Sequence, residues 1–302
     1  MCPLELDAAS ARRVRGTFRV MAATDLNAPE LGIDAIDARA SGENFPVVSL
    51  LAPRRAQPHL RAIYGFARLV DTLGDEAAGN RLALLDALEA ELDACYEGMP
   101  RTQLMQRVHA TIRAHSLPRE PFARLIEANR IDQSVHRYAT WEDVRWYCSH
   151  SAEPVGRLVL GIYGRLGEPE LVEMSDDVCT GLQLTNFLQD PPRDYALGRI
   201  YLPQEDLEHF GVEERDFAGD GSANLVQLMR FEAERAHGLL GPGITLGRAM
   251  GGRAGASVAL FARGGLAALA ALERAGWDVF SGRPAPSRWT FARLTVAQLV
   301  RR

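Results

Sequence analysis

The sequence predicts an all-α fold, and three observations support this prediction. Apolar residues recur at spacings of three and four along most of the chain, as they do on the buried face of a helix. No stretch keeps the alternation with a period of two that marks a half-buried strand. The 302 residues are 47% hydrophobic, which is enough to bury a large core. We expect one helical domain over residues 43–302, preceded by a loosely ordered extension over residues 1–42.

Prolines and capping residues mark the expected helices in the first half of the chain. Pro58 precedes an apolar stripe that runs to Asp75, so a helix should begin beside this proline. Asn80 is suited to cap the next helix, which should run to about Tyr96 and stop at Gly98. Further helices are expected over residues 101–115, 119–136 and 141–164, the last with an interruption at Pro154.

In the second half of the chain, the apolar periodicity predicts helices over residues 170–190, 223–240, 254–277 and 287–301. A short helical turn should follow Pro203. Residues 213–223 have the composition of a charged loop that contains glycine.

Charge and residue usage exclude several classes of protein. The net charge of −5 and the pI near 5.9 argue against a nucleic-acid partner, for which a basic surface is expected. The chain contains no lysine, which rules out a Schiff-base lysine and a Walker-type phosphate loop. A glycine-rich dinucleotide fingerprint after a strand is also lacking, so we expect no nucleotide cofactor.

The cysteines and the apolar segments indicate where the protein works. Its four cysteines are scattered with no C-x-x-C pair, which is typical of buried thiols in a reducing cytoplasm. No apolar leader begins the chain, and no uninterrupted apolar run reaches the ~18–20 residues that span a bilayer. We therefore expect a cytoplasmic protein, whose contact with the inner face of the membrane would be peripheral.

A column of polar side chains stands out late in the chain. Four oxygen-bearing residues follow one another at spacings of three, four and four, which places them on one helix face. They are Gln183, Asn186, Asp190 and Asp194. The two prolines after Asp190 should kink or break that helix. Taken alone, such a column is more often a solvated helix face than a metal site.

A second column changes this interpretation. On the helix that runs to Asp75, an aromatic hydroxyl, a cation and two carboxylates share one face; they are Tyr64, Arg68, Asp71 and Asp75. Two pairs of carboxylates indicate a cavity for Mg²⁺, which is bound by a few carboxylates together with substrate phosphates. The predicted metal ligands are Asp71, Asp75, Asn186, Asp190 and Asp194. Arg68 can add a donor fork to a diphosphate.

The chemistry that suits such a site is the departure of a diphosphate, which leaves a carbocation. A carbocation survives only where water is controlled, so the rest of the cavity should be apolar and aromatic. Phe45, Tyr147 and Trp277 are candidates to face the cation with their rings. Each of these residues, taken singly, is more often plain core.

These residues resemble the two acidic motifs of the squalene/phytoene synthase family. The pattern YxxxRxxDxxxDE, which begins at Tyr64, is similar to the first motif. The pattern QLxNxxxDxxxDxxxGRxYLP, which begins at Gln183, is similar to the second. The resemblance covers roughly residues 43–283. It implies an isoprenoid synthase bundle of helices around a central cavity, two or three Mg²⁺ ions with the diphosphate, and prenyl diphosphate substrates joined head to head.

The resemblance also implies roles for single residues. Tyr147, in YCSHSAEPVG, matches a family tyrosine near the reacting centre, and Trp277 falls where the family often has tyrosine. Arg199 would contact a diphosphate or hold the turn after Gly198, and the sequence does not separate these roles. The expected catalytic residues are the four aspartates and Tyr147. The expected substrate contacts are Phe45, Tyr64, Arg68, Gln183, Asn186, Arg199 and Trp277.

Within the family, the chain is most similar to a bacterial branch, the hydroxysqualene synthases. ENFPVVSLL, YGFARLVDTLGDE, SAEPVGRLVL and the pair Gln189-Asp190 are like theirs. That branch ionises presqualene diphosphate and lets water capture the cation, which implies coupling to a presqualene diphosphate synthase and a reductase. Gln189 stands where many members of the family have arginine, so one diphosphate is expected to fit better than two.

Two other functions stay open at this stage. The chain could itself condense two prenyl diphosphates, as a squalene or phytoene synthase does. It could also be a catalytically silent helical partner of an active synthase, although the retention of all four aspartates argues against this.

Overall fold

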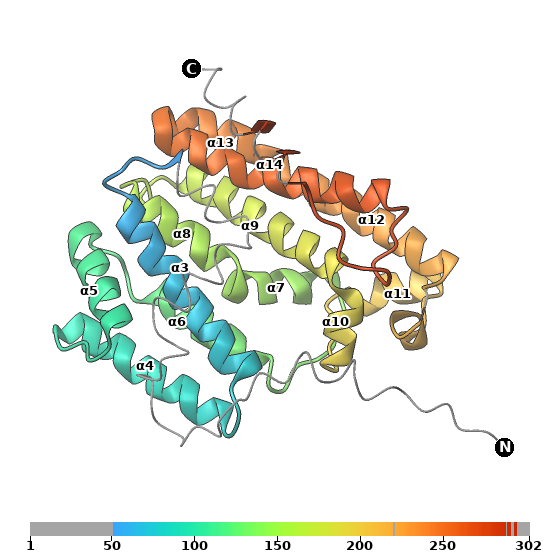
Figure 1. Ribbon diagram of the computed structural model, residues 1–302, viewed down its shortest axis with the longest axis horizontal. Coiled ribbons are helices and arrows are strands. Elements are labelled where there is room, and N and C mark those ends of the chain that lie inside the picture. Colours follow the sequence, from blue (N-terminus) through green and yellow to red (C-terminus); the bar gives the residue numbers. More distant parts are fainter. Residues whose placement is uncertain (1–50, 220, 288, 291–292, 295–302) are drawn as a thin grey trace.

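The structure is a computed structural model that describes residues 51–219, 221–287, 289–290 and 293–294. Within these ranges every regular element is a helix, which confirms the predicted all-α class (Figure 1). Phe45, the expected extension over residues 1–42 and much of the helix expected over residues 287–301 lie outside the described residues. A single domain that begins at residue 43 therefore stays a prediction.

The elements follow one another along the chain with short connections. They are α3 (Gln57–Asp71), the π-helical turn η3 (Thr72–Glu76), α4 (Arg81–Glu97), α5 (Gln103–His115), α6 (Glu120–Ile131), α7 (Trp141–Ser151), α8 (Glu153–Ile162), α9 (Pro169–Gln189), α10 (Pro191–Ala196), α11 (Gln204–Phe210), the 3₁₀ turn η4 (Glu214–Phe217), α12 (Ala223–Leu240), α13 (Pro242–Met250) and α14 (Gly252–Arg274).

Several helices begin and end where their capping residues predict. The Asn80 side chain accepts a hydrogen bond from the Ala83 backbone amide at 3.1 Å, which caps the first turn of α4. Gly98 ends the same helix in the left-handed conformation, at φ 84°. The interruption expected at Pro154 is confirmed, because α7 ends at Ser151 and α8 begins at Glu153.

Three expectations about the helices are wrong in detail. The helix expected over residues 119–136 ends at Ile131, where the chain turns and carries the Asp132 side chain inward. The expected helix over residues 254–277 is preceded by α13, which was not predicted. Its glycines have a low helix propensity, so the segment gave a weak helical signal. The charged loop contains the turn η4, which a capping box between Glu213 and Asp216 stabilises.

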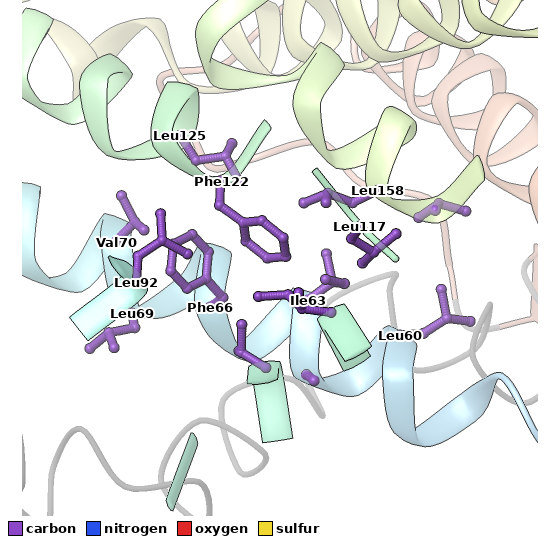
Figure 2. Close-up of a cluster of buried hydrophobic side chains, with 14 of the residues drawn as sticks. Leu60, Ile63, Phe66, Leu69, Val70, Leu92, Leu117, Phe122, Leu125 and Leu158 are labelled. Carbon is purple, nitrogen blue, oxygen red and sulfur yellow. The ribbon is translucent and has the colours of Figure 1, made fainter. Parts of the chain in front are cut away.

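The first hydrophobic cluster lies between α3, α4, α5, α6 and α8. Phe66 of α3 and Phe122 of α6 meet edge to face near its centre, with ring centroids 5.1 Å apart (Figure 2). Ile63 continues the cluster along α3, and Leu92 of α4 and Leu158 of α8 extend it onto the neighbouring helices. Because α3 is held on this cluster along its length, its carboxyl end has a fixed place beside α6.

The second cluster surrounds α9, which contacts α7, α8, α12, α13 and α14 (Figure 1). Gly181 of α9 permits a close approach of α12. A Cβ atom at this position would lie 3.0 Å from the side chains of Leu239 and Leu240. The carboxyl end of α9 is thus held between helices from both halves of the chain.

One described helix, α14, is long and apolar enough to cross a membrane. The mean hydropathy of its 18-residue window is 1.6, and 67% of that window is buried inside the fold. It packs against α9, α12 and α13. These contacts are those of a core helix.

Candidate active site

The first acidic motif lies where α3 passes into the π-helical turn η3. Ala77 donates its backbone N–H to the Thr72 carbonyl at 2.9 Å, five residues back, so the turn is wider than an α-helical one. The side chain of Asp71 is 54% exposed, and that of Asp75 is 28% exposed. The expected single α-helical column from Tyr64 to Asp75 is therefore wrong at its last turn.

Gly74 places this turn tightly against α6. A Cβ atom at Gly74 would lie 1.9 Å from Oδ1 of Asn129, so no larger residue fits without a shift. Gln133 donates its side-chain amide to the Gly74 carbonyl at 3.1 Å. Together these contacts fix the position of the backbone one residue before Asp75.

The second acidic motif is divided between two helices. α9 ends at Gln189, Asp190 caps it with non-helical dihedral angles, and α10 begins at Pro191. The break predicted from the two prolines is confirmed, whereas the expected continuous column is wrong. Asp194 still follows Asp190 closely, because its backbone N–H donates to the Asp190 carbonyl at 2.9 Å.

Arg199 joins the two motifs. Its Nη1 donates to Oδ1 of Asp75 at 2.7 Å, and its backbone N–H donates to the Asp194 carbonyl at 2.9 Å. The side chain is 7% exposed, and its Nη2 also donates to the Asp132 carbonyl at 3.3 Å. Arg199 thus holds the turn after Gly198 and contacts an acid of the first motif; contact with a diphosphate stays a prediction.

The pKa of the Asp194 carboxyl depends on the acidic residues that lie near it. Burial, and then the neighbouring charges of Asp190 and Asp75, raise its pKa to about 7, and Arg193 and Arg199 only partly offset this increase. The Asp194 carboxyl is therefore within the electrostatic range of Asp75 in the first motif, and the role of the two motifs as one metal site stays a prediction.

Sequence reasoning missed Asp132, which lies just after α6. Tyr147 donates its hydroxyl to Oδ2 of Asp132 at 2.8 Å, and Tyr201 donates to Oδ1 at 3.1 Å. Asp132 is 6% exposed, and burial raises its pKa to about 6 against the opposing effects of Arg199 and Tyr147. Between Arg130 and Gln133, this residue has the sequence pattern of a solvated helix end, so no local signal could have found it.

The two tyrosines that bind Asp132 belong to an aromatic wall of packed rings. The rings of Tyr147 and Tyr201 have centroids 5.3 Å apart, and Phe187 stacks on Tyr201 at 4.3 Å. Tyr138 lies 5.3 Å from Tyr147. Trp277 is buried in the same hydrophobic cluster and has a left-handed backbone at φ 67°. The expected role of Trp277 toward a cation stays a prediction.

The remaining predicted residues keep their places on the expected helices. Arg68 lies 4.0 Å from Asp71 and 3.8 Å from Glu76, so its guanidinium belongs to the first motif. Tyr64 is half-buried and packs against the first hydrophobic cluster. Gln183 is half-buried on α9, one turn before Phe187. Their contacts with a substrate stay predictions.

A second residue that sequence reasoning missed is Arg283. Its Nε donates to Oδ1 of Asp190 at 2.7 Å, and its Nη2 reaches Oδ1 of Asn186 at 3.5 Å. Arg283 lies nine residues after Arg274, the last residue of α14, in a stretch with no helical periodicity. A lone arginine in such a stretch gives no sign of its partner.

The donor set of the two motifs fits Mg²⁺. All of the predicted ligands offer oxygen, which hard cations prefer. Two of these carboxylates, Asp75 and Asp190, already bind a cation, the guanidinium of an arginine. Among the residues that the structure describes, no three acidic, histidine or cysteine side chains converge to hold a metal by themselves. Mg²⁺ is typically held by a few carboxylates together with the phosphates of a substrate.

Comparison with known proteins identifies the family of the chain. Residues 38–290 match the squalene/phytoene synthase family. The chain belongs to this family. It is 35% identical over 206 residues to the hydroxysqualene synthase of Rhodopseudomonas palustris. This match covers 67% of this chain and 69% of that relative. It is 33% identical over 208 residues to the 15-cis-phytoene synthase of Synechococcus elongatus, which covers 64% and 68%.

A solved relative extends the likeness to the fold. The structure of squalene synthase HpnC from Alicyclobacillus acidocaldarius is 42% identical and superposes with a TM-score of 0.75. The match covers 87% of this chain and all of that one. The chain is therefore an enzyme of the squalene/phytoene synthase type, with the helical isoprenoid synthase fold that the resemblance implied. Enzymes of this family act on prenyl diphosphates and generally use Mg²⁺.

Proposed function

We propose that this enzyme ionises presqualene diphosphate and lets water capture the carbocation, which gives hydroxysqualene. The observation that carries this proposal is the connection of the two acidic motifs through Arg199, beside the wall of Tyr147, Tyr201 and Phe187. A leaving diphosphate and a developing cation need these two surroundings next to one another. The likeness to the Rhodopseudomonas palustris hydroxysqualene synthase supports the choice of product.

Each acidic motif would contribute ligands to two or three Mg²⁺ ions. The residues assigned to them are Asp71, Asp75, Asn186, Asp190 and Asp194. The bound ions supply Lewis-acid neutralisation of the leaving diphosphate. Arg68, which lies beside Asp71, adds a donor fork to the same anion. The described helices keep the two motifs at a fixed separation, so little reorganisation is needed when the charge develops.

The aromatic wall would stabilise the carbocation that the departing diphosphate leaves. The ring quadrupoles of Tyr147, Phe187 and Tyr201 favour a nearby cation. These three side chains are almost completely buried, which limits the number of water molecules that reach the cation. We assign a similar role to Phe45 and Trp277, and contact with the prenyl chain to Tyr64 and Gln183.

Asp132 and Tyr147 can remove the proton that water must lose. The water oxygen forms a bond to the carbocation, and one of its protons passes to Oη of Tyr147. The hydroxyl proton of Tyr147 passes in turn to Oδ2 of Asp132, which it contacts at 2.8 Å. A carboxyl whose pKa is raised to about 6 by burial is well matched to accept a proton near neutral pH.

The proposal also places the enzyme among other proteins. Its substrate must come from an enzyme that joins two farnesyl diphosphates into presqualene diphosphate, and a reductase must act on its alcohol. We propose that it works in the cytoplasm, with no nucleic-acid partner and no nucleotide cofactor. Its lipid substrate and product suggest transient contact with the inner membrane face.

Product analysis tests the proposal directly. The purified protein with Mg²⁺ and presqualene diphosphate should release diphosphate and form the alcohol, and farnesyl diphosphate alone should give little product. Squalene formed with NADPH, or phytoene formed from geranylgeranyl diphosphate, would overturn the assignment. The likeness to the Synechococcus elongatus phytoene synthase makes such condensation the second candidate function.

A catalytically silent subunit is distinguished by a variant. Asp190→Ala combined with Asp194→Ala should abolish the release of diphosphate while the helical content stays unchanged. A silent partner would show neither release in the parent protein nor an effect of the two changes.

A further inference from the structure

The segment that follows α14 crosses the second acidic motif. We define the C-terminal strap as residues 278–287, drawn in red beyond α14 in Figure 1. Asp278 accepts hydrogen bonds from the backbone amides of Phe280 and Ser281, at 2.9 and 3.0 Å, which turns the chain. Gln189, the last residue of α9, donates its side-chain amide to the Pro284 carbonyl at 2.5 Å. The strap is thereby anchored one residue away from Asp190.

This anchoring places Arg283 on two predicted metal ligands. Its guanidinium donates to Asp190 at 2.7 Å and reaches Asn186 at 3.5 Å. A metal ion that binds Oδ1 of Asp190 together with Oδ1 of Asn186 must lie between these two oxygens, which is the place that the Arg283 guanidinium fills. Coordination of a metal by Asp190 and Asn186 therefore requires Arg283 to move. Arg199, in contrast, contacts a single predicted ligand, Asp75.

The two arginines on the acidic motifs differ in their freedom to move. The Arg199 side chain is 7% exposed and is also tied to the Asp132 carbonyl. The Arg283 side chain is 49% exposed and lies on a strap without regular structure. Arg199 is held in place, whereas the half-exposed Arg283 side chain can rotate away with a smaller loss of packed surface.

A nearby anion is available once the guanidinium leaves Asp190. A diphosphate that completes the metal's coordination must lie within a few ångströms of Asp190, because the metal contacts both. A guanidinium that leaves this carboxylate therefore meets the diphosphate oxygens within the reach of its own side chain. Arginine pairs with phosphate through two parallel hydrogen bonds, as it does with a carboxylate.

We propose that Arg283 is a substrate-binding residue that exchanges partners: it releases Asp190 and Asn186 to the metal and then donates to the diphosphate. This inference rests on the proposed magnesium and diphosphate site. The C-terminal strap would therefore help to form the substrate-bound site. In this site the metal ion replaces the Arg283 guanidinium on the Asp190 carboxylate.

The proposed exchange predicts that replacing Arg283 changes two binding affinities in opposite directions. In Arg283→Gln, the metal meets no competing cation, so Mn²⁺ alone should bind about fivefold more tightly than to the parent protein. Inorganic pyrophosphate, added with Mg²⁺, should bind about tenfold more weakly, because one charged donor is lost. Electron paramagnetic resonance of free Mn²⁺ measures the first effect, and titration calorimetry measures the second.

Two further variants sharpen the experiment. Arg283→Lys keeps the charge without the planar fork, so it should bind Mn²⁺ like the parent protein and recover part of the pyrophosphate affinity. Arg215→Gln is the matched control, because the Arg215 side chain is 78% exposed and pairs with Glu213, which belongs to neither acidic motif. This control should change neither affinity.

Each other outcome overturns the proposal in a distinct way. Weaker binding of both probes by Arg283→Gln would make Arg283 a structural brace of the motif. Affinities equal to those of Arg215→Gln would remove Arg283 from the site. A change in only one of the two affinities would exclude the exchange. If the parent protein binds neither Mn²⁺ nor pyrophosphate, the proposed function fails together with the inference, whereas a different product in the assay above leaves the exchange intact.

Discussion

Arg199 and Asp75 are separated by 124 positions in the sequence, and their side chains meet at 2.7 Å. The pair connects the turn after α3 with the turn after α10. Because Arg199 also binds the Asp132 carbonyl, the same guanidinium holds the acidic and aromatic halves of the site together. The position of Asp75 relative to the tyrosines therefore depends on one buried cation.

Loss of this cation should be costly for stability. Arg199→Gln leaves the partly buried Asp75 without its partner, and we expect the free energy of unfolding to fall by about 2–4 kcal/mol. Urea denaturation followed by circular dichroism measures this change. Arg215→Gln, which alters an exposed pair, should change stability by less than about 0.5 kcal/mol. Equal values for the two variants would show that Arg199 holds nothing together.

Asp132 should act through Tyr147. Asp132→Asn keeps the shape of the side chain but removes the proton acceptor, so kcat should fall about 10- to 100-fold while KM changes little. Tyr147→Phe should give a similar loss, and the double variant should be no worse than either single one. Tyr201→Phe serves as a comparison, because it removes only the second hydrogen bond to Asp132. Losses that simply multiply in the double variant would contradict a shared proton path.

Glu232 makes the stability of the protein depend on pH. It is fully buried, and burial raises the pKa of its carboxyl to about 8 although Arg235 contacts it at 2.8 Å. The native state therefore binds a proton that the unfolded chain has lost between about pH 4.5 and 8. Stability from this group is present below that window and is lost as the pH rises through it.

Glu232→Gln tests this dependence. The free energy of unfolding of the parent protein should fall between pH 5.5 and 8.5, as set by the pKa of about 8, and the fall should be smaller in the variant. Chemical denaturation at three pH values measures both curves. Parallel curves would mean that the Glu232 carboxyl already ionises at its ordinary pKa in the native state.

The close contact between Gly74 and Asn129 can be examined by paired substitutions. Gly74→Ala introduces a Cβ atom 1.9 Å from the Asn129 side chain, so we expect a loss of about 1–3 kcal/mol and a displaced Asp75. Asn129→Ser makes room, and the double variant should recover part of the stability and of the metal affinity. A double variant as poor as the sum of the two single ones would place the strain elsewhere.

Local signals were sufficient for much of the fold. The caps of α4 lie in its own sequence, at Asn80 and Gly98, and α12 begins and ends at the residues that its apolar stripe predicts. The break after Asp190 follows from the two prolines for the same reason. These features depend on the backbone of a few neighbouring residues, which a sequence displays directly.

The parts of the site that escaped prediction depend on contacts across the chain. Asp132 has two tyrosines as partners, 15 and 69 residues away, and Arg283 lies 93 residues from Asp190. No periodicity encodes such pairs, because tertiary packing decides which side chains meet. The predicted acids themselves were recognisable only because four carboxylates share helical spacings.

The π-helical turn at Thr72–Glu76 determines the direction in which the first acidic motif faces. A turn closed over five residues holds one residue more than an α-helical turn. In a regular α-helix, Asp75 would lie about one turn after Asp71 and on the same face. The wider turn rotates Asp75 away from the face of Asp71, so Asp75 meets Arg199 while the Asp71 side chain stays exposed.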